Sequence, residues 1–225
     1  MNRRWLIFAA IPPLVFAAGF ARGVFAAAAH DSYWQERTSL FDAIKTKSSV
    51  VMVGDSLTGG AEWRELFPDV SIANRGIDGD TSGGILERMN GIVSVHARKA
   101  FVMIGINDFT GADRSVEEVF GNYMKIVAAL KQGGAEVFVQ STLMCNERKA
   151  AWKSCAAANV KIKQLNRRLA APGQKEFTFI DINRELADER GLKDELTYDG
   201  VHLNGKGYLL WRDEIAPFVP AGRKP

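Results

Sequence analysis

Cysteine and histidine are scarce in this 225-residue chain, which contains two cysteines and three histidines. Cys145 and Cys155 have nine residues between them and no histidine nearby, a spacing that does not match a zinc site. We therefore expect no metal. In an exported protein the pair is expected to form a disulfide, worth roughly 2–3 kcal/mol in the chain-entropy model if unstrained. Two free thiols are the alternative.

The chain also lacks a large excess of charge. Its formal net charge is +3, and three of its cations, Arg3, Arg4 and Arg22, lie in the first 29 residues. That segment has a basic start, an apolar run from Trp5 to Phe20 and small residues at its end, which is the pattern of a secretory leader. Without it the chain has no net charge, so we expect neither a nucleic-acid partner nor a polybasic membrane patch.

An uninterrupted membrane span is absent from the sequence too. A spanning helix needs about 20 apolar residues, whereas the apolar run here is broken by two prolines and closed by Arg22. We therefore expect residues 1–29 to be a leader, cleaved near Ala28 or Ala29, and residues 30–225 to form one periplasmic or secreted domain. A retained N-terminal anchor is the alternative, and the paired arginines are compatible with twin-arginine export.

What the sequence does contain is an alternation of short apolar runs and helical patterns. The runs lack the polar alternation of a half-exposed sheet and predict five buried strands, at residues 50–53, 70–73, 100–104, 136–141 and 178–182. Helical patterns cover residues 31–47, 116–132, 156–169 (with Val160 on the apolar face) and 204–217. This order predicts an α/β fold, a three-layer αβα sandwich with a doubly wound, flavodoxin-like parallel sheet of order 2-1-3-4-5.

In such a sheet, ligands bind where the carboxyl ends of the first and third strands meet. Ser56 follows the first strand in the stretch Gly54-Asp55-Ser56-Leu57, and we expect a helix to reopen near Gly59. Asn107 follows the third strand, so its amide is placed to donate a hydrogen bond to an oxyanion beside Ser56. Each stretch taken alone also fits an ordinary turn.

A serine nucleophile needs a base of near-neutral pKa, and histidine is the usual one. His30 lies at the leader boundary, and His96 precedes the third strand at the opposite edge of the sheet. His202 lies in a glycine-rich loop before the last helix. Asp199, three residues earlier, is placed to accept from Nδ1 and leave Nε2 free for Ser56. A solvated surface turn is the alternative.

The loop after the second strand, with the sequence NRGIDGDTSGGI, supplies a fourth candidate segment. Its glycines permit positive φ or close backbone approach, and the Gly79 N–H is a candidate oxyanion donor. Asp80 or Thr81 is expected to cap a helix that starts near Gly83.

These four segments, in this order and at strand ends, resemble the four blocks of the SGNH (GDSL) hydrolase family over about residues 48–215. The stretches WRELFP and NRGIDGDT resemble most the branch of platelet-activating-factor acetylhydrolase-like esterases. The resemblance implies a serine ester hydrolase without a cofactor. Ser56 would be the nucleophile, His202 the base and Asp199 its orienting acid. The Ser56 N–H, the Gly79 N–H and the Asn107 side chain would be the oxyanion donors.

Asp55 and Asp108 belong to the same blocks, and we interpret them as residues that order the loops. The Gly-x-Ser-x-Gly motif of α/β-hydrolases is absent, since Thr58 stands where its last glycine would be.

The expected reaction is hydrolysis of short, O-acetyl-type esters on a glycan or small alcohol through an acyl-enzyme. The loops after Ser56 and Asn107 are short and leave little sequence for a long acyl tunnel. A lysophospholipase or thioesterase is the nearest alternative; an O-acyltransferase or a catalytically inactive carbohydrate-binding domain are others. Trp63, Phe109 and Trp152 are either a sugar platform or core residues.

Overall fold

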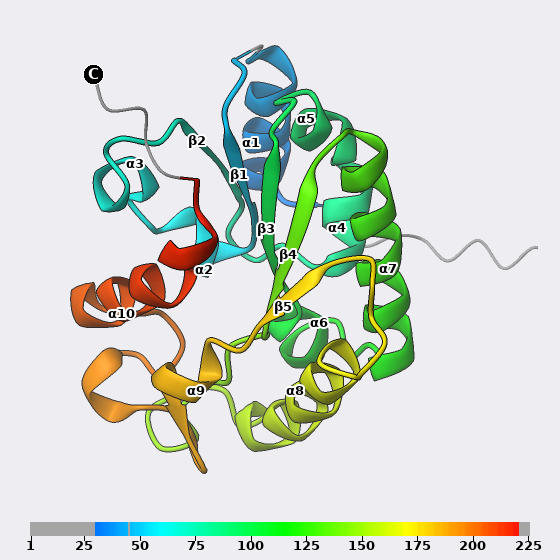
Figure 1. The fold of residues 1–225 in the computed structure, drawn as a ribbon. Coiled ribbons are helices and arrows are strands. Elements are labelled where there is room, and N and C mark those ends of the chain that lie inside the picture. Colours follow the sequence, from blue (N-terminus) through cyan, green and yellow to red (C-terminus); the bar gives the residue numbers. More distant parts are fainter. Residues whose placement is uncertain (1–29, 45, 221–225) are drawn as a thin grey trace, which may run out of the picture. The chain divides into compact units, whose positions relative to one another are not determined.

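The computed structural model describes residues 30–44 and 46–220 (Figure 1). The predicted leader and its cleavage site therefore lie outside the described residues. Within the described part of the chain, no helix combines the length and apolarity needed to cross a bilayer.

Five parallel strands form the predicted sheet, in the order β2-β1-β3-β4-β5. They are β1 (Val50–Gly54), β2 (Ile72–Gly76), β3 (Lys99–Met103), β4 (Glu136–Gln140) and β5 (Thr178–Ile180). The 2-1-3-4-5 order is confirmed, so β1 and β3 are neighbours and their carboxyl ends meet. The second strand begins two residues later than expected and runs on to Gly76, which carries the chain directly to the serine-bearing turn.

Successive residues of each strand face opposite sides of the sheet, and both sides are buried. Val51 and Val53 pack into one hydrophobic core, whereas Val50 and Met52 pack into the other. The first core is covered by α4 (Ser82–Glu87), α5 (Met89–Val93), α7 (Val116–Gln132) and α8 (Cys155–Leu169). The second is covered by α2 (Ser56–Gly59), α3 (Trp63–Leu66), α9 (Asn183–Leu186) and α10 (Gly205–Ile215). The arrangement is the expected αβα sandwich (Figure 1).

The remaining elements are short or lie at the edge of the sandwich. Helix α1 (Ser32–Ala43) forms where the sequence predicts one but ends before the predicted residue 47, because Ile44 is extended. Helix α6 (Ile106–Thr110) closely follows β3. Two 3₁₀ turns, η1 (Asp194–Leu196) and η2 (Ala216–Phe218), flank α10.

The structure also differs from the sequence-based expectation after β1, in α8 and after β5. The helix after β1 begins at Ser56 itself rather than near Gly59, because the Asp55 carboxylate caps it by accepting the Leu57 N–H at 3.0 Å. Val160 is 56 % exposed, since α8 turns Ala158 and Ile162 toward the core instead. Between β5 and the last helix the chain also forms a two-stranded antiparallel hairpin, β6 (Ala187–Asp188) and β7 (Gly191–Leu192).

Candidate active site

Ser56 is the first residue of α2, immediately beyond β1. The turn that presents it is tight. A Cβ at Gly54 would lie 2.2 Å from Thr58 Oγ1 and 2.4 Å from the carbonyl oxygen of Met103, so only glycine fits there. The serine is therefore held at the carboxyl end of β1 by close packing between β1, β3 and α2.

A chain of two hydrogen bonds links Ser56 to His202, 146 positions away in the sequence, and through it to Asp199. Ser56 Oγ lies 2.9 Å from His202 Nε2, and His202 Nδ1 lies 2.7 Å from Asp199 Oδ2. With Nδ1–H donating to the carboxylate, Nε2 is left as an acceptor for the serine hydroxyl proton. The predicted nucleophile, base and acid are thus brought together in hydrogen-bonding order.

Asp199 is held as a carboxylate by the turn that carries it, residues 197–203, which an antiparallel bridge between Thr197 and Leu203 closes. Partial burial acts to raise the pKa of Asp199. Hydrogen bonds from His202 Nδ1–H and from the backbone N–H groups of Val201 and His202 outweigh it and lower the pKa to about 2. The acid is therefore ionised throughout the neutral range and fixes the orientation of the imidazole.

The loop that carries Gly79 packs directly against α2. A Cβ at Gly76 would lie 2.2 Å from the backbone nitrogen of Gly59, and the Ile77 N–H donates to the Gly54 carbonyl at 3.2 Å. Gly79 itself adopts a φ of +73°, a conformation that favours glycine. The backbone after β2 is thereby brought beside the serine-bearing turn.

Asn107 lies in the first turn of α6, and its amide reaches the same loop. One N–H of Nδ2 donates to the Asp80 carbonyl at 2.9 Å, which orients the side chain and leaves the second N–H for another acceptor. Gly105, which precedes this helix, has a φ of +127° and turns the chain sharply after β3. The structure therefore places Ser56, Gly79 and Asn107 on neighbouring segments at the switch point.

Near these segments the structure buries three further aspartates, Asp55, Asp80 and Asp108. We call them the buried carboxylate cluster. Burial raises the pKa of Asp55 to about 7 and that of Asp108 to about 6. Asp108 accepts the backbone N–H and the hydroxyl of Ser82 at 2.9 and 2.7 Å. With the cap that Asp55 forms on α2, these contacts show Asp55 and Asp108 ordering the loops, as the sequence analysis interpreted them.

Asp80 is paired instead with an arginine that the sequence analysis missed. Arg88 Nε lies 2.7 Å from Asp80 Oδ2, with both side chains almost completely buried. Arg88 also donates to the Gly54 carbonyl at 3.2 Å, and the Trp34 Nε1–H donates to Asp80 Oδ1 at 3.1 Å. Thr81 rather than Asp80 therefore caps the next helix, by accepting the Gly84 N–H. Nothing local in the sequence marks Arg88 or Trp34, because their partners are distant in the chain.

The three aromatic residues considered for a sugar platform differ in how far they are exposed. Trp63 is 1 % and Phe109 is 5 % exposed, so both are core residues, whereas Trp152 is partly exposed. Trp63 packs edge-on against Trp211, with 5.1 Å between ring centroids.

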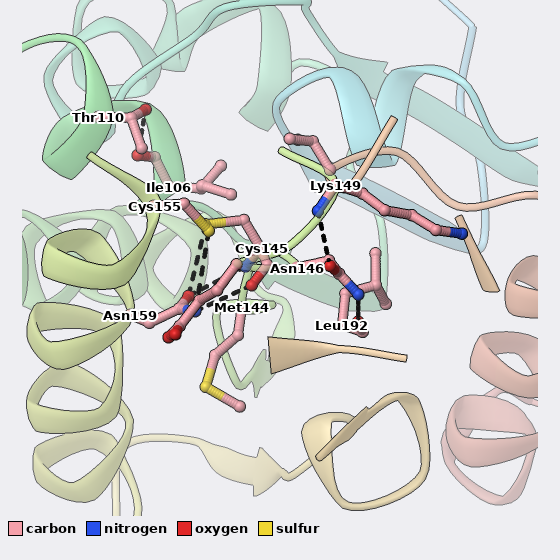
Figure 2. The surroundings of a disulfide bond; sticks show 12 residues. Ile106, Thr110, Met144, Cys145, Asn146, Lys149, Cys155, Asn159 and Leu192 are labelled. Atoms are coloured by element: carbon pink, nitrogen blue, oxygen red, sulfur yellow. Dashed lines mark hydrogen bonds between the residues drawn. A yellow bond between two sulfur atoms is a disulfide. The ribbon is translucent and has the colours of Figure 1, made fainter. Parts of the chain in front are cut away.

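Cys145 and Cys155 are joined in a disulfide (Figure 2). Across the described residues, no group of three or more histidine, cysteine, aspartate or glutamate side chains is arranged to hold a metal ion.

Comparison with solved structures agrees with the fold described above. The structure superposes on a GDSL-like lipase from Bacteroides thetaiotaomicron with a TM-score of 0.72 and 24 % identity, covering 82 % of this chain and 96 % of that one. The likeness shows the fold.

Two curated proteins resemble this chain at similar levels of sequence identity. Platelet-activating factor acetylhydrolase IB subunit alpha2 of Rattus norvegicus is 28 % identical over 189 residues, 79 % of this chain and 80 % of the relative. N-acylneuraminate cytidylyltransferase of Streptococcus agalactiae serotype V is 27 % identical over 175 residues, 77 % of this chain but only 39 % of that protein.

Residues 52–210 match the family described as GDSL-like Lipase/Acylhydrolase, and this match includes Ser56, Gly79, Asn107, Asp199 and His202. The chain belongs to this family and has the fold of the SGNH/GDSL hydrolases.

Proposed function

We propose that this protein hydrolyses short acyl esters through an acyl-enzyme on Ser56. His202 Nε2 takes the hydroxyl proton as Ser56 Oγ attacks the ester carbonyl, and it returns that proton to the departing alcohol. Water then attacks the acyl group in the same way and releases the acid. The Ser56 N–H, the Gly79 N–H and the free N–H of Asn107 stabilise the oxyanion in both steps.

A single observation carries this proposal: the 2.9 Å contact between Ser56 Oγ and His202 Nε2, continued by the 2.7 Å contact between His202 Nδ1 and Asp199. A serine that only caps a helix would need no imidazole behind it. An imidazole at hydrogen-bonding distance from the hydroxyl, oriented by an ionised carboxylate, is the arrangement that activates a serine.

Two features favour a small acyl group on a bulky alcohol, such as an O-acetyl ester of a glycan. The helices that begin at Ser56 and Ile106 are only four and five residues long, so they provide little surface to line a tunnel for a long acyl chain. The His202 and Asp199 side chains are 48 % and 55 % exposed, which leaves the acid–base side open to a polymer. One curated relative is itself named an acetylhydrolase.

Hydrolysis rates across p-nitrophenyl esters from acetate to palmitate, measured beside acetylated xylan and other acetylated polysaccharides, test the substrate. We expect the acetate ester to be fastest and acetate to be released from at least one polymer. A maximum at long chains would favour the lysophospholipase or thioesterase alternative instead. Acyl transfer to an added sugar in preference to water would identify an acyltransferase.

A serine-directed fluorophosphonate tests the nucleophile directly. We expect the probe to label the wild-type protein and to leave Ser56→Ala unlabelled. If the wild-type protein is not labelled and hydrolyses none of these esters, the domain would be a binding module.

We also propose that the mature protein is residues 30–225 and acts in the periplasm or outside the cell. The disulfide supports this, because such bonds persist in oxidising compartments. The intact mass of the protein recovered from the periplasmic fraction is the test. A mass of the full chain in the membrane fraction would support a retained anchor instead.

A further inference from the structure

The segment from Cys145 to Cys155, which we call the disulfide loop, lies between the two sides of the proposed active site. On one side, Ile106 of α6 shares a hydrophobic core with both cysteines and lies beside the disulfide in Figure 2. On the other side, the loop contacts the 197–203 turn, which carries Asp199 and His202. The proposed reaction uses no atom of this loop.

Three contacts join the disulfide loop to the 197–203 turn. The Asn146 N–H donates to the Gly200 carbonyl at 2.7 Å, and Lys149 Nζ donates to the Thr197 carbonyl at 3.1 Å. Gly200 has a φ of +85°, and a Cβ there would lie 2.3 Å from the backbone nitrogen of Ala150. The two backbones therefore meet with no room for a side chain, and a displacement of the loop would displace the turn.

Asn146 stiffens the disulfide loop from within. Its Oδ1 accepts the backbone N–H groups of Arg148 and Lys149, both at 2.9 Å, and its Nδ2 donates to the Leu192 carbonyl at 2.6 Å. Asn146 is 1 % exposed, and its bond to the Leu192 carbonyl is buried. These hydrogen bonds hold the backbone of Lys149 at the turn.

Both ends of the disulfide loop are fixed to one helix. Cys155 is the first residue of α8, and the disulfide joins Cys145 to it. Asn159, one turn along α8, accepts the Cys145 N–H at 3.0 Å and donates to the Cys145 carbonyl at 2.9 Å (Figure 2). Because α8 packs in the core, the disulfide ties the loop to a rigid element.

We propose that the disulfide loop is a positioning element for the Asp199–His202 turn, with Lys149 as its positioning residue, so that opening the disulfide lowers kcat. This inference rests on the proposed role of His202 as the base. A base displaced by about 1 Å can cost up to 10²-fold in rate, even when the change lies outside the reacting groups. Opening the bond takes two electrons and two protons from a dithiol, which is itself oxidised to a disulfide, and leaves two thiols.

Lys149→Met removes the ammonium donor and keeps most of the side-chain length. We expect kcat to fall about three- to tenfold with KM within twofold, because the turn is misplaced while the substrate surface is kept. Lys149→Arg should restore most of the loss. Lys153→Met, an exposed lysine of the same loop with no hydrogen bond to the turn, is the matched control and should behave as wild type. A kcat within twofold of wild type for Lys149→Met overturns the role of Lys149.

The double variant Cys145→Ala/Cys155→Ala tests the covalent closure. We expect kcat to fall about 10- to 100-fold when it is assayed well below its melting temperature. Val127→Ala, a buried α7 position that belongs to neither the disulfide loop nor the 197–203 turn, lowers stability and should keep its kcat. An unchanged kcat in the double variant, or an equal loss in Val127→Ala, overturns the proposal. If the double variant does not fold, the Lys149 series decides.

Failure of this inference is distinguishable from failure of the proposed function. Hydrolysis that survives Ser56→Ala would refute the nucleophile and the inference with it. Hydrolysis that depends on Ser56 but is insensitive to both the Lys149 and the cysteine variants would refute the inference alone. A thiol titration of the denatured, unreduced wild-type protein should find no free group, and two free groups per chain would remove the premise.

Discussion

Aspartates occupy two contrasting environments around Ser56. Asp55, Asp80 and Asp108 are at most 2 % exposed, whereas the Asp199 side chain is 55 % exposed. Burial raises the pKa of each member of the buried cluster, but hydrogen bonds lower that of Asp199 to about 2.

The contrast separates two functions of the same residue type. Asp55 and Asp108 each organise a backbone segment through hydrogen bonds from N–H groups, which a protonated carboxyl or an amide oxygen can also accept. Asp199 instead supports an imidazole that must take up a positive charge during the reaction, which requires an ionised carboxylate. For Asp55 and Asp108 the shape of the side chain therefore matters more than its charge, whereas for Asp199 the charge matters more.

The largest effect is expected from removing the serine or the imidazole. Ser56→Ala and His202→Ala should each lower kcat by several orders of magnitude, about 10⁵–10⁶-fold where the triad acts as one unit. The double variant should lose little more than either single one. Single-turnover and steady-state rates on p-nitrophenyl acetate are the measurement. If Ser56→Ala keeps a tenth of the activity, the site lies elsewhere.

Asp199→Asn tests the exposed side of the comparison. It keeps the shape but loses the charge, and it sets the wrong imidazole tautomer, so kcat should fall by about 10²–10⁴-fold, less than for His202→Ala. The steady-state kcat and KM of purified protein would measure it. A loss under threefold would show that the imidazole is oriented without this carboxylate.

Asn107 connects the buried carboxylate cluster to the proposed reaction. The backbone carbonyl of Asp80 accepts one N–H of the Asn107 amide, and the other N–H is left for the oxyanion. Loss of one oxyanion donor typically costs about 10²–10³-fold in rate, so Asn107→Ala should lower kcat in that range with little change in KM. Asn107→Asp should be at least as damaging, because a carboxylate repels the developing negative charge.

Asn183→Ala is the matched control for Asn107. Asn183 likewise donates from Nδ2 to a backbone carbonyl, that of Thr142, but does so away from Ser56. The Asn183→Ala variant should be less stable than wild type but keep its kcat. If Asn107→Ala behaves in the same way, Asn107 is only a turn residue.

The smallest change in activity is expected on the buried side, from Asp55→Asn. Because the pKa of Asp55 is raised to about 7, the folded protein keeps a proton there that the unfolded chain releases near pH 4. The contribution of Asp55 to the free energy of unfolding should therefore fall as pH rises from about 4 to 7. Asp55→Asn should flatten that slope and leave kcat within about threefold, since the amide oxygen still accepts the Leu57 N–H.

The contribution of Asp199 to the free energy of unfolding depends on pH in the opposite direction, because the pKa of Asp199 is lowered in the folded state. Its contribution is present above pH 4 and is lost as pH falls toward 2, and its exposure keeps the effect small. Urea unfolding of wild type, Asp55→Asn and Asp199→Asn from pH 2 to 8 measures both slopes. Parallel curves for all three proteins would remove the electrostatic part of the comparison.

Much of the fold is written locally in the sequence. Strands buried on both faces must be apolar at successive positions, so residues 50–53 and 100–104 identified β1 and β3 almost to the residue. The start of α2 was misplaced because the cap at Asp55 depends on one side-chain rotamer rather than on a periodic pattern. Val160 was misplaced because an apolar residue at helical spacing does not reveal which face meets the sheet.

For the candidate site, too, the sequence predicted some features and only the structure showed the others. By itself the sequence determined the residue types and their order, because a serine, an asparagine and an Asp-x-x-His pair must follow particular strands for the chemistry to be possible. Only the tertiary structure decided which of these side chains meet, since Ser56 and His202 are 146 residues apart. It alone also revealed the Arg88–Asp80 pair and the contacts of Trp34 and Lys149. The physical reason is that hydrogen bonds and burial depend on distances in space, and a linear pattern carries no record of those distances.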